Sequence, residues 1–201
     1  SPEWVGLKNY VRAFTDEIYL RSYLHNILYI LGTLLVEICF GLLMAALLNS
    51  DSRGFSIYRV LFFSPVVVSM VAAGLLWTYV YDLRFGLLNT FLTGIGLESL
   101  TNAWLSDPRT ALAAVTVVSG WKYTGVYMII YLAALQRIPK TYYEAAIIDG
   151  AGAVRVFFRI TVPLLRETTV VAVLLGFTGG FAAFDLFFSM TNGQPFNATE
   201  I

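Results

Sequence analysis

Three ionisable residues lie inside long apolar runs of the sequence: Glu37, Lys122 and Asp185. A charge placed among apolar groups is costly unless other groups satisfy it, so we expect each of these residues to face the interior of a helix bundle, and each is a candidate for binding chemistry. Glu37 shares a helical face with Thr33, Gly41 and Ala45, because these residues recur at a spacing of four. Small residues at that spacing let helices approach closely, so a packing seam with one structural carboxylate is an equally good interpretation of Glu37.

Aromatic residues accompany the other two charges. Lys122 is followed by a stripe that includes Tyr123 and Tyr127, and Asp185 stands among Phe181, Phe184 and Phe188. Such stripes serve packing more often than ligand binding. Carboxylates accept hydrogen bonds from hydroxyls, however, and rings stack on apolar C–H faces, so a pathway for a polyhydroxylated solute could use both. The predicted pathway residues are Glu37, Lys122, Tyr123, Tyr127, Phe181, Phe184, Asp185 and Phe188.

A second candidate is the short charged stretch YYEAAIIDGAG at 142–152, which separates two apolar runs. Pro139 ends the preceding run. Thr141 stands three residues before Glu144, the spacing of a capping box. Gly150 can adopt the left-handed conformation that stops a helix. A second helical piece is predicted at about 153–161, with Pro163 in the first turn of the next run.

This stretch predicts a helical elbow with an exposed, small, apolar surface. The surface would be formed by Ala145, Ala146 and the following 147–148. A short helix of this kind suits a groove on another protein. A capped connector with no partner is the alternative, but the connection between the two apolar runs is long for that role.

The elements that position these groups are apolar and long. The 201 residues are 58% hydrophobic and only 13% charged, unlike an ordinary soluble domain. A membrane-spanning helix needs about 20 mostly apolar residues. Four stretches qualify: 24–48, 58–81, 110–135 and 168–190. The expected fold class is therefore an all-α, polytopic transmembrane helical bundle, formed by one domain over 1–201.

The charges indicate orientation and exclude some partners. Thirteen basic and thirteen acidic residues give no net charge, so nucleic acid is not an expected partner. Basic residues crowd around the loop at 136–163, which places that loop in the cytoplasm and both chain ends outside. The outside connection at 82–109 is rich in turn residues, and a short interfacial helix is expected at 87–97. Aromatic residues in 1–23 favour the membrane–water boundary.

Enzyme motifs are absent from the sequence. There is no G-x-x-x-x-G-K-[ST] phosphate loop, no cluster of cysteine and histidine, and no Gly-x-Ser-x-Gly turn. We therefore expect that the chain is not an enzyme and carries no metal or cofactor of its own.

The elbow resembles the cytoplasmic loop of permease subunits of ATP-binding-cassette importers. That loop has the pattern E-A-A, three residues, G, nine residues, I, one residue, L-P. Here Glu144 to Ala146 are followed by Gly150, Ile160 and Pro163, with Val162 in place of the leucine. VGLKNY at 5–10, LAALQRIPKTYYEAAIIDGA at 132–151 and FDLFFSMTNGQP at 184–195 are similar to the carbohydrate-type, maltose/glycerol-phosphate-permease-like branch, with Gln194 where that branch usually has a second glycine.

This resemblance implies a methionine-importer-permease-like fold, with four spans of a six-span subunit in the bacterial inner (plasma) membrane. It implies import of a sugar or related small solute. The implied partners are a second permease subunit, two ATP-binding subunits and an extracytoplasmic solute-binding protein, with ATP and Mg²⁺ bound by the ATP-binding subunits. The implied coupling residues are Glu144, Ala145, Ala146, Asp149, Gly150, Ile160 and Pro163.

One other class of transporter remains open on the residues. Glu37 and Asp185 could serve as ion or proton sites of a secondary transporter that uses an ion gradient instead of ATP. Such a transporter would give the elbow no partner to bind.

Overall fold

The computed structural model describes residues 6–49, 53–192 and 199, and these residues fold entirely into helices and their connections. Two of the segments that resemble the carbohydrate-type branch are only partly described. Val5 of VGLKNY and 193–195 of FDLFFSMTNGQP lie outside the described residues. The chain divides into two compact units. One consists of 33–69 and 119–179, and the other of 1–32, 70–118 and 180–201.

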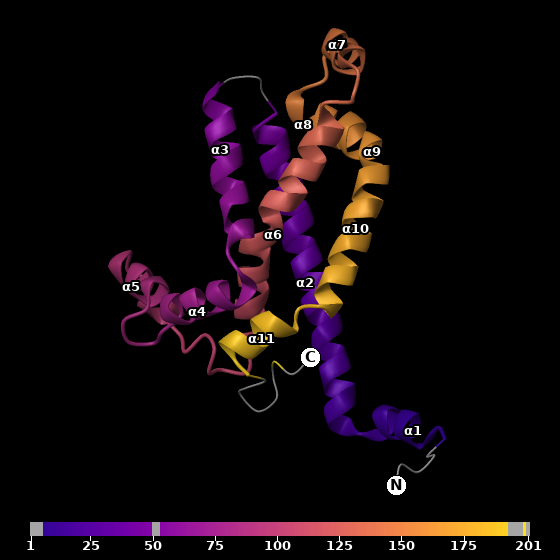
Figure 1. Cartoon of the computed structure of the whole chain (residues 1–201). Coiled ribbons are helices and arrows are strands. Elements are labelled where there is room, and N and C mark those ends of the chain that lie inside the picture. The colour runs from indigo at the N-terminus through magenta and orange to yellow at the C-terminus, as the bar shows by residue number, and fades with distance from the viewer. Residues whose placement is uncertain (1–5, 50–52, 193–198, 200–201) are drawn as a thin grey trace. The chain divides into compact units, whose positions relative to one another are not determined.

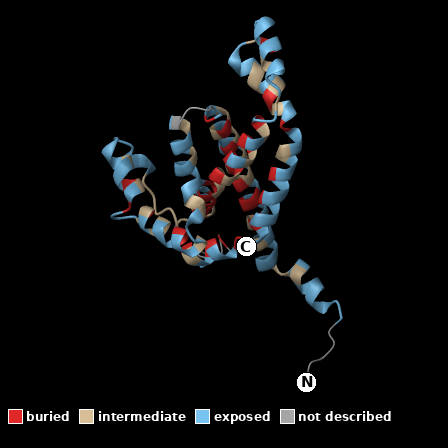
Figure 2. Cartoon of the chain, turned by 45° about the horizontal axis from the view of Figure 1, so that its top comes forward, coloured by how far each residue is buried: buried red, intermediate tan, exposed pale blue. Residues whose placement is uncertain are grey.

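The unit at 33–69 and 119–179 is a helix bundle (Figure 1). Its long elements are the later part of α2 (Glu17–Leu47), α3 (Arg53–Phe63) with η1 (Ser64–Val67), most of α6 (Ala111–Leu135), and α10 (Arg166–Phe181). Figure 1 shows them running alongside one another. Figure 2 shows buried positions along their facing sides. The buried core consists of Ala45, Leu48, Tyr127, Met128, Tyr131, Leu132, Leu135, Leu165 and Ala172.

Polar groups in this bundle are paired across helices. The Tyr131 hydroxyl donates to Thr169 Oγ1 at 3.1 Å, which links α6 to α10. The Arg59 guanidinium donates to the Leu48 carbonyl at 2.6 Å, which links α3 to the end of α2. Buried polar groups that lack partners are costly, so these bonds fix how the helices face one another.

The other unit combines shorter helices. It contains α1 (Lys8–Thr15), the start of α2, α4 (Met70–Val80), α5 (Leu87–Gly94), η2 (Glu98–Leu100), the start of α6, and α11 (Phe184–Met190). Helix α11 packs on α4, where Gly74 faces the side chains of Ser189 and Met190. The rings of Tyr29 and Phe187 meet edge to face with centroids 4.8 Å apart. Helix α5 confirms the short helix expected within 87–97.

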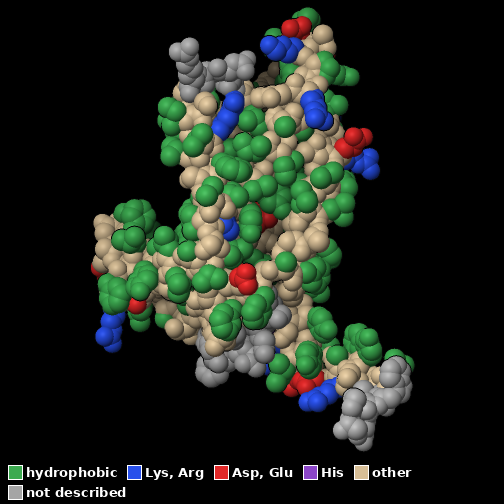
Figure 3. Space-filling view, viewed as in Figure 1, with side chains coloured by type: hydrophobic (Ala, Val, Ile, Leu, Met, Phe, Trp, Pro, Cys, Tyr) green, Lys and Arg blue, Asp and Glu red, His purple; other side chains and the backbone are tan. Residues whose placement is uncertain are grey.

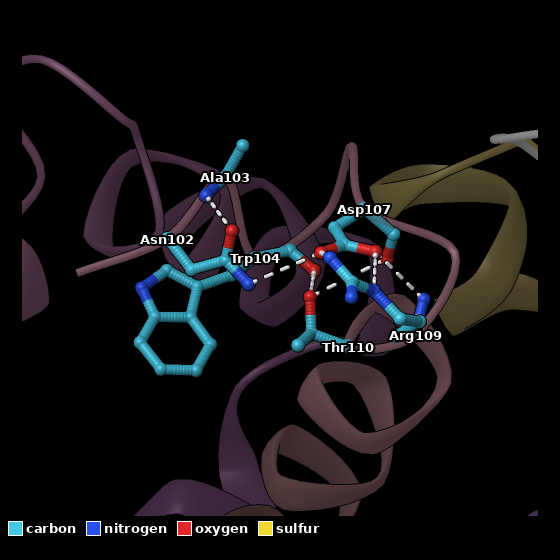
Figure 4. Close-up of polar contacts among 6 residues, drawn as sticks. All are labelled: Asn102, Ala103, Trp104, Asp107, Arg109 and Thr110. Atoms are coloured by element: carbon cyan, nitrogen blue, oxygen red, sulfur yellow. Dashed lines mark hydrogen bonds and ion pairs between the residues drawn. The ribbon is translucent and has the colours of Figure 1, made fainter. Parts of the chain in front are cut away.

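A polar network holds the connection before α6 (Figure 4). The Trp104 indole N–H donates to Asn89 Oδ1 at 2.8 Å, and the Thr110 hydroxyl donates to the Trp104 carbonyl at 2.9 Å. Arg109 and Asp107 form an ion pair at 3.0 Å. Side-chain and backbone hydrogen bonds from Arg109 lower the pKa of Asp107 to about 2. The Asp107 carboxylate is therefore charged throughout the physiological pH range.

This pKa leads to a testable pH dependence. Because the folded pKa of Asp107 is depressed, the stability that its carboxylate contributes is present above the ordinary aspartate pKa of about 3.9 and is lost as the pH falls through about 2. Proteolytic cleavage of the 101–110 connection, expressed relative to cleavage of an unfolded reference peptide at the same pH, should thus be unchanged from neutral pH to about pH 4. A marked rise in cleavage within that range would show that the ion pair does not hold the connection.

The helices depart from the four predicted spans in a specific way. Among the described residues, α2 alone is long and apolar enough to cross a membrane by length and composition. Two broken pairs, 54–67 with 70–80 and 153–164 with 166–181, would raise this number to three if each pair is one span. Helix α6 covers the predicted span at 110–135, but Ser119, Lys122 and several hydroxyl groups interrupt its apolar run.

Candidate functional site

The elbow predicted between the two apolar runs is present and helical. It consists of α7 (Lys140–Ile148), α8 (Ala153–Val156), η3 (Phe157–Thr161) and α9 (Val162–Leu164). Figure 1 shows α7 beyond the end of α6, with α8 beside that end. In Figure 3, Lys, Arg, Asp and Glu side chains gather at this end, while hydrophobic side chains cover much of the bundle's flank.

The start of α7 differs from the prediction. The helix begins at Lys140, Pro139 is its N-cap, and no side chain caps it. The predicted capping box of Thr141 and Glu144 is therefore wrong. The reason is that the Pro139 carbonyl already accepts the first helical bond, from the Tyr142 N–H at 3.2 Å. This places Thr141 inside the first turn, where its hydroxyl cannot act as the N-cap.

The end of α7 agrees with the prediction for Gly150. Gly150 has a φ of +72°, in the left-handed region that favours glycine. Its N–H bonds the Ile147 carbonyl at 3.0 Å, and the Ala151 N–H bonds the Ala146 carbonyl at 2.9 Å. This pair of bonds is the Schellman motif that closes a helix C-terminus. The turn into α8 thus depends on the backbone conformation of one residue.

The apolar surface of α7 is narrower than predicted. Ile147 and Ile148 are 70% and 86% exposed, and Ala145 is exposed as well. Ala146 is only 6% exposed, so its assignment to the exposed surface is wrong. Ala146 lies on the side of α7 that faces the rest of the elbow, where the Tyr143 hydroxyl also lies 3.4 Å from Thr161 Oγ1.

A groove of about 950 Å³ runs between α7 and the α8–η3 segment. Ala145, Asp149 and Ile160, three of the predicted coupling residues, line it together with Ala146. Glu144 and Pro163 are exposed elsewhere on the elbow. The coupling residues predicted from the sequence did not include Arg155 and Arg159, which also line the groove. The signal that could have identified these two arginines is their spacing of four residues, which places both on one face of a helix. The groove is lined by Thr141, Tyr142, Ala145, Ala146, Asp149, Ala151, Arg155, Val156, Arg159 and Ile160.

Glu37 lies in a packing seam between α2 and α6. It is 4% exposed, and its carboxylate accepts a hydrogen bond from the Ser119 hydroxyl at 3.3 Å and another from Tyr127. A Cβ on Gly41, one turn along α2, would lie 2.6 Å from the Cβ of Tyr127. The small residues therefore do let the helices approach closely, as the seam interpretation predicted. Ser119 could not have been identified from the sequence, because it belongs to another helix.

Lys122 is also held inside the bundle. It is 3% exposed, and its ammonium donates to the carbonyls of Pro65 at 3.3 Å, Val66 at 3.1 Å, and Val68. It also lies 5.5 Å from the centre of the Tyr123 ring, which is half-buried. A lysine ammonium has three N–H donors, and three carbonyls engage them here. In this arrangement Lys122 has no donor left for a solute.

The side chain of Asp185 is exposed, so the expectation that it faces the interior is wrong. The helix that was predicted to run unbroken through 168–190 ends at Phe181, and α11 begins at Phe184. Asp185 occupies the first turn of α11, whose buried side is formed by Leu186, Phe187 and Met190, and its own side chain is exposed.

The phenylalanines near Asp185 are exposed as well. Phe184 and Phe188 are 64% and 59% exposed, and their rings stack with centroids 5.6 Å apart. Phe181, 58% exposed, precedes the break and belongs to α10. The predicted pathway residues thus belong to two different units of the chain. Glu37, Lys122, Tyr123 and Tyr127 lie together in the bundle, while Asp185, Phe184 and Phe188 lie together on the exposed side of α11.

Comparisons with known proteins agree with this architecture. Residues 37–199 match the family model described as "Binding-protein-dependent transport system inner membrane component". The chain is 40% identical to the probable ABC transporter permease protein YurN of Bacillus subtilis, over 100% of this chain and 70% of that protein. It is 36% identical to the diacetylchitobiose uptake system permease protein NgcF of Streptomyces coelicolor, over 99% of this chain and 60% of that protein.

A solved structure shares the fold. In the crystal structure of a bacterial ABC transporter involved in the import of the acidic polysaccharide alginate, one chain matches with a TM-score of 0.84 and 24% sequence identity. The match covers 100% of this chain and 70% of that chain.

Proposed function

Because the chain belongs to the family of binding-protein-dependent transport system inner membrane components, we propose that it is the permease subunit of an ATP-driven importer for a sugar or a related small solute. The similarity to a diacetylchitobiose uptake permease supports the choice of solute. In this proposal the chain is not an enzyme and holds no cofactor. ATP and Mg²⁺ are bound by partner subunits, which supply the energy.

The elbow at 140–164 is the observation that carries the proposal. A helix that is closed by a Schellman motif and exposes Ile147 and Ile148 presents apolar side chains at one end of the bundle. Such a helix fits a groove on a partner protein. We assign that groove to an ATP-binding subunit. When the ATP-binding subunit binds ATP, movement of its groove would then move α7. The segments η3 and α9 would transmit this movement to α10.

The predicted coupling residues serve this joint in different ways. Gly150 sets the turn, and Asp149 and Ile160 line the groove beside α7. Ala146 packs inside the elbow, Ala145 is exposed at the groove, and Glu144 is exposed outside it. Pro163 lies in the first turn of α9. Two ATP-binding subunits, a second permease subunit and an extracytoplasmic solute-binding protein would complete the importer.

The energy source tests this proposal against its alternative. Vesicles that contain the complete complex should take up solute when ATP is supplied, with no ion gradient present. An ion-coupled secondary transporter would instead use Glu37 or Asp185 as an ion site and would respond to a proton or sodium gradient without ATP. Uptake that follows the gradient and ignores ATP would overturn the proposal. Vesicles with a hydrolysis-deficient ATP-binding subunit are the matched control.

Asp185 is the best remaining candidate for contact with the solute. Its carboxylate is exposed on α11 beside the stacked rings of Phe184 and Phe188, a combination that suits hydroxyls and apolar sugar faces. We expect Asp185→Ala to reduce sugar uptake about tenfold while the complex still assembles, since a hydrogen bond to a charged group is worth about 1.5–3 kcal/mol. The measurements are the rate of uptake and the yield of intact complex.

A variant of a second exposed acid, Glu98→Ala in η2, controls for the general loss of a negative charge. If Asp185→Ala loses the complex instead of the uptake rate, Asp185 pairs with a charge on another subunit. The assignment of Asp185 to the solute pathway would then be wrong.

A further inference from the structure

The three carbonyls that Lys122 engages lie where a helix stops inside an apolar stretch. The η1 helix ends at Val67, and Val68 is extended, with φ −67° and ψ 135°. The Val68 N–H closes this helix by donating to the Pro65 carbonyl at 3.2 Å, and a carbonyl oxygen has a second lone pair that can accept a further donor. In an apolar environment such carbonyls need another donor or a cation, because water is not there to satisfy them.

We propose that Lys122 is a tethered cation. Its ammonium fills a small carbonyl site that would otherwise take a free monovalent cation, and it thereby fixes the end of η1. The Pro65, Val66 and Val68 oxygens converge on one nitrogen, as the oxygens of a carbonyl site converge on an alkali cation. The side chain that supplies this nitrogen is 3% exposed.

The place of this contact in the chain gives it a functional consequence. Ser69 directly follows the residues whose carbonyls bond Lys122. It is the last residue of its unit before the chain continues into α4. Lys122 therefore controls where the chain leaves the bundle. It acts as a positioning residue and not as a solute contact, because its three donors are already used.

Chemical rescue of Lys122→Ala tests this inference. The alanine variant keeps the Cβ and removes a group with the size and charge of n-propylammonium. We expect its uptake in the complete complex to fall about tenfold or more, because buried carbonyl acceptors lose their donor. Added n-propylammonium chloride should restore uptake several-fold. It should also raise the melting temperature of the purified variant, since a ligand that binds only the folded state stabilises it.

Two matched controls make the result specific. Lys122→Met fills the same space with a neutral side chain, so it should show the same loss and no rescue. Tetramethylammonium chloride supplies charge without N–H donors, so it should not rescue Lys122→Ala. The inference is overturned if Lys122→Ala keeps wild-type uptake and melting temperature, or if n-propylammonium changes neither quantity. The melting measurement requires no transport, so its outcome is independent of the proposed function.

Discussion

Replacement of Gly150 with aspartate is expected to abolish solute uptake by the assembled complex, while the chain still inserts into the membrane. Gly150 has a φ of +72°, and residues with a Cβ are disfavoured there by about 1–2 kcal/mol. The new carboxylate would also lie beside Asp149 at the C-terminal end of α7, where the helix dipole disfavours negative charge. Both effects act against the turn that presents Ile147 and Ile148.

The surroundings of Gly150 allow the backbone effect to be isolated. A Cβ on this residue would have nothing within 4 Å, so steric crowding does not contribute. Gly150→Asn has the shape of the aspartate variant and a similar tolerance of the left-handed conformation but adds no charge, so it should retain more uptake than Gly150→Asp by the amount that the charge contributes. Gly152→Ala is the matched control, because Gly152 has a φ of −71° and equally open space. Normal uptake by Gly150→Asp at normal expression would contradict the proposed role of the turn.

Local sequence signals predicted the C-terminal end of α7 better than its start. A glycine after a helix can be identified from sequence, since few other residues adopt a positive φ. The start depended on a competition between Pro139 and Thr141 for the N-cap position. Both residues are compatible with a helix start, and only the backbone hydrogen bond from Tyr142 to Pro139 shows which one is the N-cap. Similarly, the burial of Ala146 depends on the return of the chain through η3, which no local pattern encodes.

The charged residues show that sequence can predict burial but not the partners that come from other helices. Burial of Glu37 and Lys122 followed from the cost of a charge among apolar side chains. Their partners did not follow, because the Ser119 hydroxyl and the carbonyls near Pro65 come from other helices. Asp185 was predicted to be buried because 168–190 looks like one apolar run. The break between α10 and α11 instead places Asp185 in the first turn of a new helix.

The helix break near Pro65 illustrates why apolar length alone overestimates continuous spans. Hydropathy predicts one span at 58–81, since valine and serine beside Pro65 do not reduce the apolar character. The helix that contains Pro65 ends at Val67, and carbonyls at a helix end must find partners outside that helix. Lys122 provides those partners here. A lysine in the middle of one predicted span and a proline inside another are therefore two parts of one structural feature.

Gly125→Ala is expected to destabilise the protein, whereas Gly179→Ala is not. A Cβ on Gly125 of α6 would lie 2.8 Å from the Phe63 Cα and 2.9 Å from the Phe62 carbonyl carbon of α3. These are backbone atoms, which cannot rotate away as a side chain can, so α6 and α3 must separate. Overpacking of this kind costs about 1–3 kcal/mol, which lowers the melting temperature of a chain of this size by about 3–10 °C.

The comparison with Gly179 separates crowding from the general effect of removing a glycine. Gly179 lies in α10, and a Cβ there would have nothing within 4 Å. Alanine at this position should keep or raise the melting temperature, because it favours a helix over glycine by about 1 kcal/mol. Equal melting temperatures for Gly125→Ala and the wild type would show that the close approach of α6 to α3 is not required. Separation of these helices should also reduce uptake, since Lys122 lies one turn before Gly125 and its carbonyl partners lie just beyond Phe63.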